Sequence, residues 1–185
     1  AVRYVKEDAF DLVFDFELSE SLLEGINGSD GKQIINALEF NTKLYPDLQK
    51  ANFLTNHDMN RVMDVFQNDN NKAKLGAIIL LTSPGVPFIY YGEEIGMNGS
   101  KPDEDIRKPM QWDSSENAGF STSLPWRTIN SNYEISNVAT AEKDPESLLN
   151  VYKNLIQIRN QSEALTIGQF YPLDTNDENV IAYFR

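Results

Sequence analysis

Three short apolar runs, separated by segments of helical character, constrain the fold of this chain more than any other feature. The runs are residues 12–16, 51–55 and 86–91, and each has the length of a buried strand. Helices are predicted between them, one beginning after Asp30 and one over about 71–83. Strands that alternate with helices are typical of βα units around a parallel sheet. The sequence therefore predicts an α/β fold.

The ends of the first two helices are marked by local signals. A Gly/Asn/Ser loop is predicted over 25–31, and Asp30 within it is placed to cap a helix, with Gln33 positioned as in a capping box. The apolar character of residues 77–81 on all sides predicts that the second helix is sandwiched between other elements. The remaining signals are an apolar face of Ile34, Leu38 and Tyr45, a stop at Pro46 for the first helix, and a stop at Pro84 and Gly85 for the second.

The second half of the chain has a different organisation. A polar loop is predicted from the end of the second run to about residue 70, and a longer one over 92–143, a length that indicates function or interruption by short helices. A helix follows over 145–161, with Asp144 as its N-cap and Pro145 at its first position. The last predicted elements are strands at 166–172 and 179–185, which form a hairpin around a turn at 174–179.

This organisation predicts two domains that are both incomplete. Residues 1–164 contain the βα units, and residues 165–185 begin an all-β module. A parallel sheet of three strands leaves both edges unpaired. The chain is therefore expected to be a piece of a larger protein, and its missing strands to leave apolar surface exposed.

Composition excludes several classes of function. The net charge of −12 argues against a nucleic-acid or anionic-membrane partner, since both need clustered Lys and Arg. No run of about 18 apolar residues is present, so no membrane span is expected. The absence of cysteine excludes thiolate metal sites and Cys nucleophiles, and a single histidine excludes a zinc site of the usual kind. The compartment is not fixed by any of these features.

The first candidate site is Asn56-His57-Asp58, which directly follows the second apolar run. In a βα barrel, the carboxyl ends of the strands face the active site. Asp58 can stabilise positive charge on a sugar ring, and His57 can hydrogen-bond a sugar hydroxyl. Arg61 can pair with a carboxylate or bind another hydroxyl. Taken on residue chemistry alone, a His-Asp pair after a strand is more commonly a loop or helix cap, so both interpretations stay open.

Two further segments carry candidate residues. Glu93 and Glu94 follow the third run, but neighbours on an extended chain point to opposite sides, which favours a structural function for both. Residues 107–113, RKPMQWD, combine an Arg and a Trp that can stack on a sugar or simply pack within a loop. No G-x-S-x-G elbow, Walker A motif or dinucleotide fingerprint is present.

Together, three ordered motifs resemble the α-amylase superfamily of glycoside hydrolases. FLTNHDMNR (53–61) is similar to the family's last catalytic motif, and GVPFIYYGEEIGM (85–97) to the barrel strand and turn that follow it. RKPMQWDSSENAGFS (107–121) resembles a loop of the oligo-1,6-glucosidase, neopullulanase and trehalose-synthase branches. The resemblance implies the C-terminal part, strands six to eight, of a (β/α)8 TIM barrel. It also implies the start of a C-terminal β-sandwich domain.

The resemblance also implies a retaining mechanism and particular residue functions. Asp58 matches the carboxylate that stabilises the transition state, His57 matches a histidine that binds the innermost sugar, and Arg61 is expected to shape that subsite or the next. The family's nucleophile and acid/base follow strands four and five, and this chain has no match for either. The chain alone is therefore expected to be inactive, with the missing half of the barrel as its partner.

What the resemblance leaves open is the reaction of the parent protein. The implied function is hydrolysis of α-1,4 or α-1,6 bonds in an α-glucan or a malto- or isomalto-oligosaccharide. Alternatives are a transglycosylase or sugar isomerase of the same superfamily, and a non-catalytic carbohydrate-binding or interaction relative. No cofactor is expected in this segment, and any calcium site of the parent is expected in the missing part of the barrel.

Overall fold

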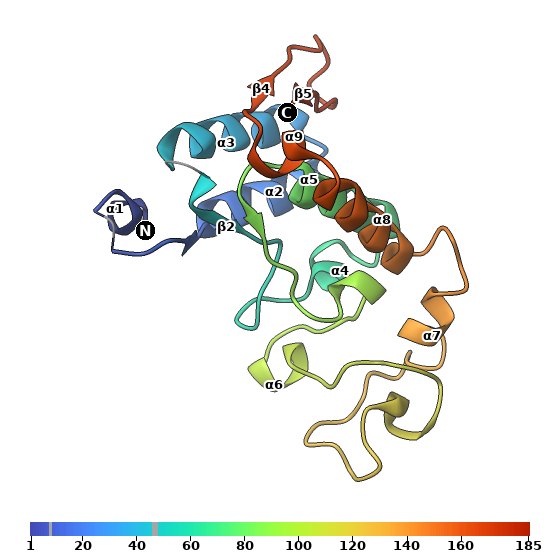
Figure 1. The fold of residues 1–185 in the computed structure, drawn as a ribbon. Coiled ribbons are helices and arrows are strands. Elements are labelled where there is room, and N and C mark those ends of the chain that lie inside the picture. The colour runs from blue at the N-terminus through green and yellow to red at the C-terminus, as the bar shows by residue number, and fades with distance from the viewer. Residues whose placement is uncertain (8, 46–47) are drawn as a thin grey trace. The chain divides into compact units, whose positions relative to one another are not determined.

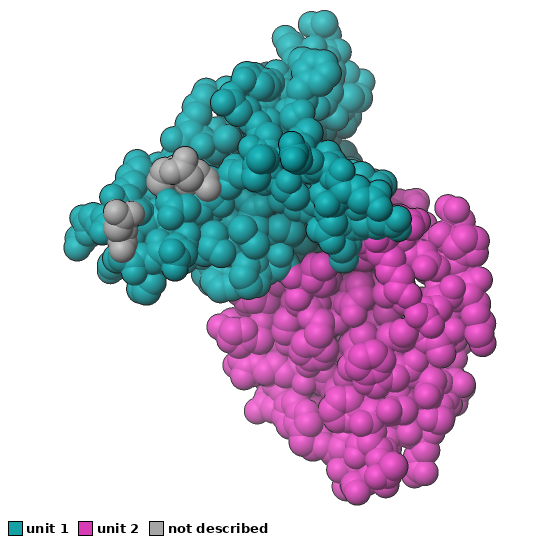
Figure 2. Space-filling view, in the orientation of Figure 1, with its two compact units in different colours: residues 1–54, 75–88, 155–185 teal, residues 55–74, 89–154 magenta. Residues whose placement is uncertain are grey.

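The computed structural model describes residues 1–7, 9–45 and 48–185. It contains two compact units, which Figure 2 shows in different colours. Unit 1 consists of residues 1–54, 75–88 and 155–185, and unit 2 of residues 55–74 and 89–154. Within the part of the chain that the structure describes, no helix is long and apolar enough to cross a bilayer.

Unit 1 contains a parallel sheet, as the alternation of apolar runs and helices predicts (Figure 1). Its strands are β1 (Val13–Phe14), β2 (Lys50–Asn52) and β3 (Val86–Pro87), in the spatial order β1-β2-β3. Phe14 pairs with Ala51, and Ala51 pairs in turn with Val86. The prediction of βα units and a parallel sheet is confirmed.

The strands are shorter and more exposed than the apolar runs predict. Phe14 on β1 is 48% exposed, and Phe88, just after β3, is 40% exposed. The two rings contact each other at a centroid distance of 4.8 Å, and Phe14 also contacts the buried ring of Phe53 at 5.6 Å. A strand lies within each of the predicted runs 12–16 and 86–91, but the prediction that these strands are buried is wrong, because an apolar run shows which side chains prefer burial but not what covers them.

A helix that the sequence analysis missed follows β1, after the short N-terminal helix α1 (Val2–Lys6) earlier in the chain. Helix α2 (Phe16–Gly28) begins at Asp15, whose carboxylate accepts a hydrogen bond of 3.1 Å from the Leu18 amide. The predicted loop at 25–31 is thus wrong up to Gly28. Gly25 lies inside the helix for a packing reason, since a Cβ there would lie 2.5 Å from Cγ1 of Ile34.

Helix α3 (Gly31–Leu44) packs against α2 and begins where the sequence predicts. The Asp30 carboxylate accepts a 2.8 Å hydrogen bond from the Gln33 amide, which confirms the cap. The capping box itself is incomplete, because the Gln33 side chain donates to Glu24 instead, at 3.2 Å. The predicted stop at Pro46 lies outside the described residues. The predicted apolar face is buried and consists of Ile34, Leu38 and Tyr45.

The next helical region contains one expected and one unexpected helix. Helix α4 (Val62–Val65) interrupts the segment predicted as a polar loop. Helix α5 (Asn70–Thr82) confirms the prediction over 71–83 to within a residue at each end. In its apolar second half, four side chains are buried: Ala77, Ile79, Leu80 and Leu81. Ile78 is 43% exposed, so this part of the helix is not enclosed on all sides.

The chain leaves α5 through a turn that requires glycine. Gly85 has a φ of +115°, a region that side chains other than glycine rarely adopt. A Cβ at this position would also lie 2.9 Å from the carbonyl oxygen of Lys50 on β2. The helix ends at Thr82, just before Pro84 and Gly85 as predicted, and the close approach of β2 accounts for glycine at position 85.

The long segment 92–143 in unit 2 is interrupted by short helices, which was one of the two explanations that its length suggested. These are η2 (Glu93–Ile95), α6 (Asp103–Ile106), η3 (Glu116–Gly119) and α7 (Val138–Ala141). Ile95, Met97 and Met110 of this segment form an apolar cluster with Leu149, which lies further along the chain, and Val138 and Ala141 pack against it.

The C-terminal elements differ from prediction mainly at their starts. Helix α8 (Leu148–Asn160) begins after the predicted N-cap Asp144, whose carboxylate caps the preceding turn at the Glu146 amide, 2.9 Å away. Helix α9 (Glu163–Ile167) occupies the first residues of the predicted strand 166–172. The Ser162 side chain caps this helix by accepting a hydrogen bond from the Leu165 amide. Strands β4 (Tyr171–Pro172) and β5 (Tyr183–Phe184) pair antiparallel, which confirms the hairpin.

Candidate active site

The segment that follows β2 in the chain presents two polar side chains on a tight turn in unit 2. The side-chain oxygen of Asn56 accepts a 2.8 Å hydrogen bond from the Asp58 amide, and its carbonyl accepts one of 3.2 Å from the Met59 amide. This Asx turn places the His57 and Asp58 side chains outward, 65% and 61% exposed. Both are accessible to a ligand.

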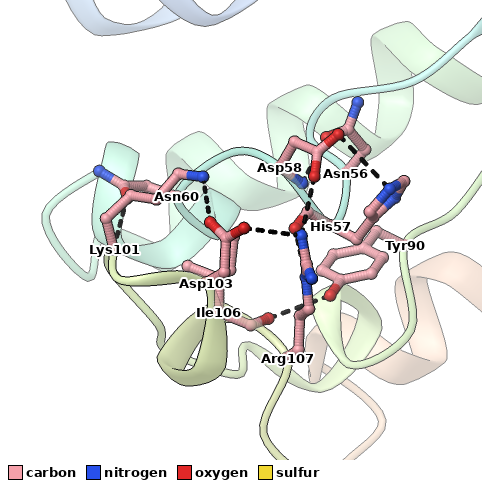
Figure 3. Close-up of polar contacts among 9 residues, drawn as sticks. All are labelled: Asn56, His57, Asp58, Asn60, Tyr90, Lys101, Asp103, Ile106 and Arg107. Carbon is pink, nitrogen blue, oxygen red and sulfur yellow. Dashed lines mark hydrogen bonds and ion pairs between the residues drawn. The ribbon is translucent and has the colours of Figure 1, made fainter.

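Asp58 is paired on both of its oxygens, as Figure 3 shows. Nη2 of Arg107 donates to one oxygen at 2.8 Å, and Nε2 of His57 lies 3.4 Å from the other. The same Arg107 donates through Nε to the His57 carbonyl at 2.8 Å. One guanidinium therefore fixes both the Asp58 carboxylate and the backbone that carries it.

The charges continue beyond Arg107 in alternating sign. Nη2 of Arg107 also donates to Asp103 at 3.0 Å, and the Lys101 ammonium donates to the same carboxylate. These contacts, first the hydrogen bond from Lys101 and then the Arg107 charge, hold the pKa of Asp103 below its ordinary value. The backbone amide of Lys101 donates to the Asn60 side chain at 2.8 Å, which returns the chain of contacts to the turn.

The sequence analysis left two interpretations for RKPMQWD, contact with a sugar or packing within a loop. In the structure, some of its residues fit the first interpretation and others the second. Arg107 contacts Asp58, a pairing that the sequence analysis did not predict. Gln111 is fully buried and donates to the carbonyl of Ser136, so it packs within the loop. Trp112 is half exposed and can stack on a ligand. Lys101 and Asp103 carried no sequence signal beyond their charge.

Arg61 lies beneath the turn rather than on its surface. Its side chain is 1% exposed, and its guanidinium lies 4.6 Å from the ring centroids of both Tyr90 and Tyr91. Nη1 donates to the Tyr91 carbonyl at 2.6 Å, and the Arg61 amide donates to the Gly99 carbonyl at 2.8 Å. Arg61 therefore ties three parts of unit 2 together through cation–π and hydrogen-bond contacts.

Glu93 and Glu94 lie in the short helix η2 and not on an extended strand, which corrects the geometric reason given above for separating them. The Glu93 carboxyl is buried and accepts a 2.8 Å hydrogen bond from the Tyr152 hydroxyl on α8. Burial raises the pKa of Glu93 to about 8, against the opposing effect of the Tyr152 hydrogen bond. Both observations agree with the structural function predicted for Glu93.

The raised pKa of Glu93 predicts how stability depends on pH. The folded protein holds a proton on Glu93 that the unfolded chain releases above a pKa of about 4.5, so stability falls as pH rises from about 4.5 to 8. Glu93→Gln is neutral at every pH and should remove this fall. The stability of Glu93→Gln relative to the parent should therefore rise between pH 5 and 9. We expect this gain to be at least about 1.4 kcal/mol in the free energy of unfolding, which corresponds to one pKa unit, and to appear as a higher relative Tm.

Thermal unfolding followed by circular dichroism at several pH values measures this difference. The exposed residue Glu134 provides the control, since Glu134→Gln should follow the parent at every pH. A Glu93→Gln profile parallel to the parent's would show that this carboxyl does not change its protonation on unfolding.

Within the described ranges, no group of three or more His, Cys, Asp or Glu side chains is arranged to hold a metal ion. The acidic groups on α6 are engaged with cations: Asp103 contacts Lys101 and Arg107, and Asp105 contacts Arg127. The arrangement instead offers one exposed carboxylate, oriented by a guanidinium, beside an imidazole.

Comparison with protein families identifies the family to which this chain belongs. Residues 1–168 match the family described as "Alpha amylase, catalytic domain". The chain belongs to the α-amylase catalytic-domain family, whose fold is the TIM barrel, and the resemblance drawn from its three motifs is confirmed.

Two relatives show how similar the chain is to individual members of the family. Alpha-amylase 3 of Dictyoglomus thermophilum is 40% identical over 176 residues, which cover 92% of this chain and 35% of that protein. Oligo-1,6-glucosidase of Parageobacillus thermoglucosidasius is 33% identical over 174 residues, covering 72% of this chain and 31% of that protein. The chain thus spans about a third of the length of these relatives.

Solved structures give the same assignment. The crystal structure of alpha-amylase from H. orenii superposes with a TM-score of 0.87 at 35% identity, covering 97% of this chain and 37% of that one. Isomaltulose synthase from Klebsiella sp. LX3 superposes with a TM-score of 0.77 at 26% identity, covering 94% of this chain and 40% of that one. An alpha-amylase and an isomaltulose synthase therefore share this part of the fold.

Proposed function

We propose that the full-length protein containing this chain is a retaining glycoside hydrolase that acts on α-glucosidic bonds of α-glucans or their oligosaccharides. The observation that carries the proposal is the Asp58 carboxylate, exposed on a turn and held by Arg107 at 2.8 Å. The names of the relatives, alpha-amylase and oligo-1,6-glucosidase, supply the substrate class.

In this proposal Asp58 stabilises the transition state rather than forming a bond. Cleavage of a glycosidic bond develops positive charge on the sugar ring, and a carboxylate held in place beside that ring stabilises the charge without reorganising. Arg107 fixes the orientation of Asp58, while His57 donates a hydrogen bond to a sugar hydroxyl. The two carboxylates of the double displacement lie outside this chain, so the chain alone is inactive.

Arg61 supports this subsite from below in the same proposal. Its guanidinium is buried and lies against the neighbouring Tyr90 and Tyr91 rings, so we assign it the function of shaping the subsite through the turn and not that of touching the sugar. This interpretation keeps the expectation that Arg61 shapes the site and drops direct contact with a hydroxyl.

We also infer the place of the chain within the barrel. In this assignment β1, β2 and β3 are strands six, seven and eight, and α8 is the last barrel helix. Residues 1–164 are the C-terminal portion of the catalytic barrel, and residues 165–185, with the β4–β5 hairpin, begin a β-sandwich domain. The parallel order β1-β2-β3 supports this placement.

A second candidate function, sugar isomerisation or transglycosylation, is favoured by one specific observation. Isomaltulose synthases superpose on this chain with TM-scores of 0.71 to 0.77. The same covalent sugar–enzyme intermediate can be released by water or by another sugar hydroxyl, and acceptor-binding groups determine which one reacts.

Product analysis of the full-length protein tests both candidates. Maltotetraose, isomaltotriose and sucrose are each incubated with the enzyme, and the products are followed by NMR from the first turnover. Hydrolysis with release of the α-anomer supports the proposal, and isomaltulose from sucrose supports the isomerase. Release of the β-anomer contradicts a retaining mechanism. Absence of turnover on all three, with sugar binding retained, indicates the non-catalytic alternative.

A further inference from the structure

Helix α6 connects the candidate site to a second ion pair on the same element. It is a single turn, Asp103–Ile106, and leads directly into Arg107. A helix of this length has no stability of its own and needs contacts with its surroundings to persist. Because Asp103 begins this turn and Arg107 directly follows it, whatever holds α6 in place also determines where Arg107 meets Asp58.

Asp105 on α6 makes a two-point contact that does not involve Asp58. Its two oxygens accept hydrogen bonds from Arg127, one from Nε at 3.0 Å and one from Nη2 at 2.9 Å. Lys108 adds a third cationic contact at 3.4 Å. Such a two-point pair between guanidinium and carboxylate fixes angle as well as distance. The hydrogen bond from Arg127 also holds the pKa of Asp105 below its ordinary value.

We propose that Asp105 and Arg127 are positioning residues for Asp58: their two-point ion pair fixes α6, and α6 in turn holds Arg107 against Asp58. Asp105 and Arg127 contact each other, while Asp58 contacts Arg107 and His57, so the pair acts through Arg107 and not on a substrate. The inference rests on the proposed function, in which Asp58 stabilises the transition state.

Other anchors of α6 determine how large the effect is. The Tyr90 hydroxyl donates to the Ile106 carbonyl at 3.0 Å, and the Tyr91 hydroxyl donates to the Lys108 carbonyl at 2.8 Å. A Cβ at Gly99 would lie 2.6 Å from the Asp105 carbonyl oxygen, so the backbone is closely packed there. Loss of the Asp105 pair therefore loosens α6 without unfolding unit 2.

The test uses the full-length protein with Asp105→Asn, an isosteric change that removes the charge of the pair. A displacement of about 1 Å at a catalytic group can cost about 10²-fold in rate, and with the tyrosine anchors still present we expect about a tenfold fall in kcat. KM should change by less than about twofold, because the Asp58 contact strengthens in the transition state.

Two further variants separate positioning from a general loss of structure. Arg127→Lys keeps the charge but loses the two-point geometry, so its kcat should lie between the parent and Asp105→Asn. Glu142→Gln removes a comparable exposed ion pair of unit 2, that of Glu142 with Lys153 at 2.7 Å, and should leave kcat unchanged. In an Asp58→Asn background the effect of Asp105→Asn should shrink to less than about twofold, since both act through one contact.

A crystal structure of the Asp105→Asn protein gives a reading that does not depend on activity. We expect the Arg107–Asp58 contact, 2.8 Å in the parent, to lengthen beyond hydrogen-bond range. An unchanged contact, or an unchanged kcat while Asp58→Asn is impaired, overturns the positioning function alone. Full turnover by Asp58→Asn itself overturns the proposed function, and the positioning function with it.

Discussion

Asp58→Asn in the full-length protein should lower kcat by about 10²–10³-fold, the size expected when one preorganised contact to a developing charge is removed. Asparagine has almost the same shape as aspartate, and its side-chain oxygen can still accept from Arg107, so the turn made by Asn56 should persist. What is lost is the negative charge that faces the sugar ring in the transition state. KM should change much less than kcat for that reason.

Steady-state kinetics on the preferred oligosaccharide measure this effect, with Asp11→Asn as the matched control. Asp11 is also exposed, lies in unit 1, and carries the same change of charge. Its kcat should equal that of the parent. An Asp58→Asn enzyme with near-parental kcat would show that this carboxylate does not stabilise the transition state. A raised KM with unchanged kcat would instead assign it to ground-state binding.

The largest effect on stability is expected at Arg159, which is buried in unit 1. Its guanidinium donates to three carbonyls near the end of α5, those of Leu81 at 2.8 Å, Ser83 at 3.1 Å and Gly85 at 2.7 Å. The last carbonyls of a helix have no partner within the helix, and a cation at this end is favourable. Arg159 therefore supplies the donors that this helix end and the following turn lack.

Arg159→Met should lower the free energy of unfolding by about 2–4 kcal/mol. Methionine keeps most of the apolar stem but leaves three carbonyls without their charged donor, and hydrogen bonds to charged groups contribute about 1.5–3 kcal/mol each before partial rescue by water. Chemical denaturation followed by fluorescence or circular dichroism measures the loss. The change in m-value reports whether the denatured state is affected as well.

Arg3→Met is the control for Arg159→Met, since it makes the same substitution at an exposed site. Arg3 pairs with Glu7 at 3.3 Å, and the two side chains are 75% and 58% exposed. Exposed pairs of this kind contribute about 0–1 kcal/mol, so the control should stay within that range. Equal losses for the two variants would show that the carbonyl contacts of Arg159 contribute nothing particular to stability.

Local signals predicted those parts of the fold that depend on neighbours in sequence. The cap at Asp30, the extent of α5 and its end before Gly85 all follow from side-chain chemistry within a few residues. Helix α2 was missed because Gly25 resembles a loop residue. Only its packing against Ile34 of α3 explains why the helix contains it.

The candidate site shows the same division. The motif around Asp58 was readable in the sequence, because the three motifs occur in a fixed order along the chain. The pairing of Asp58 with Arg107, 49 residues away, was not readable, since it depends on where α6 lies in the folded unit. The burial of Arg61 against two tyrosine rings is likewise a consequence of long-range packing.

The sequence by itself thus determined the family, the parallel order of the strands and the identity of the exposed carboxylate. Each of these depends on residue type and order along the chain. The tertiary structure alone decided that Arg107, directly after α6, holds this carboxylate, and that Arg61 is buried and not exposed beside it. The physical reason is that ion pairs and cation–π contacts require atoms within a few ångströms of one another, and such proximity is set by packing across the fold.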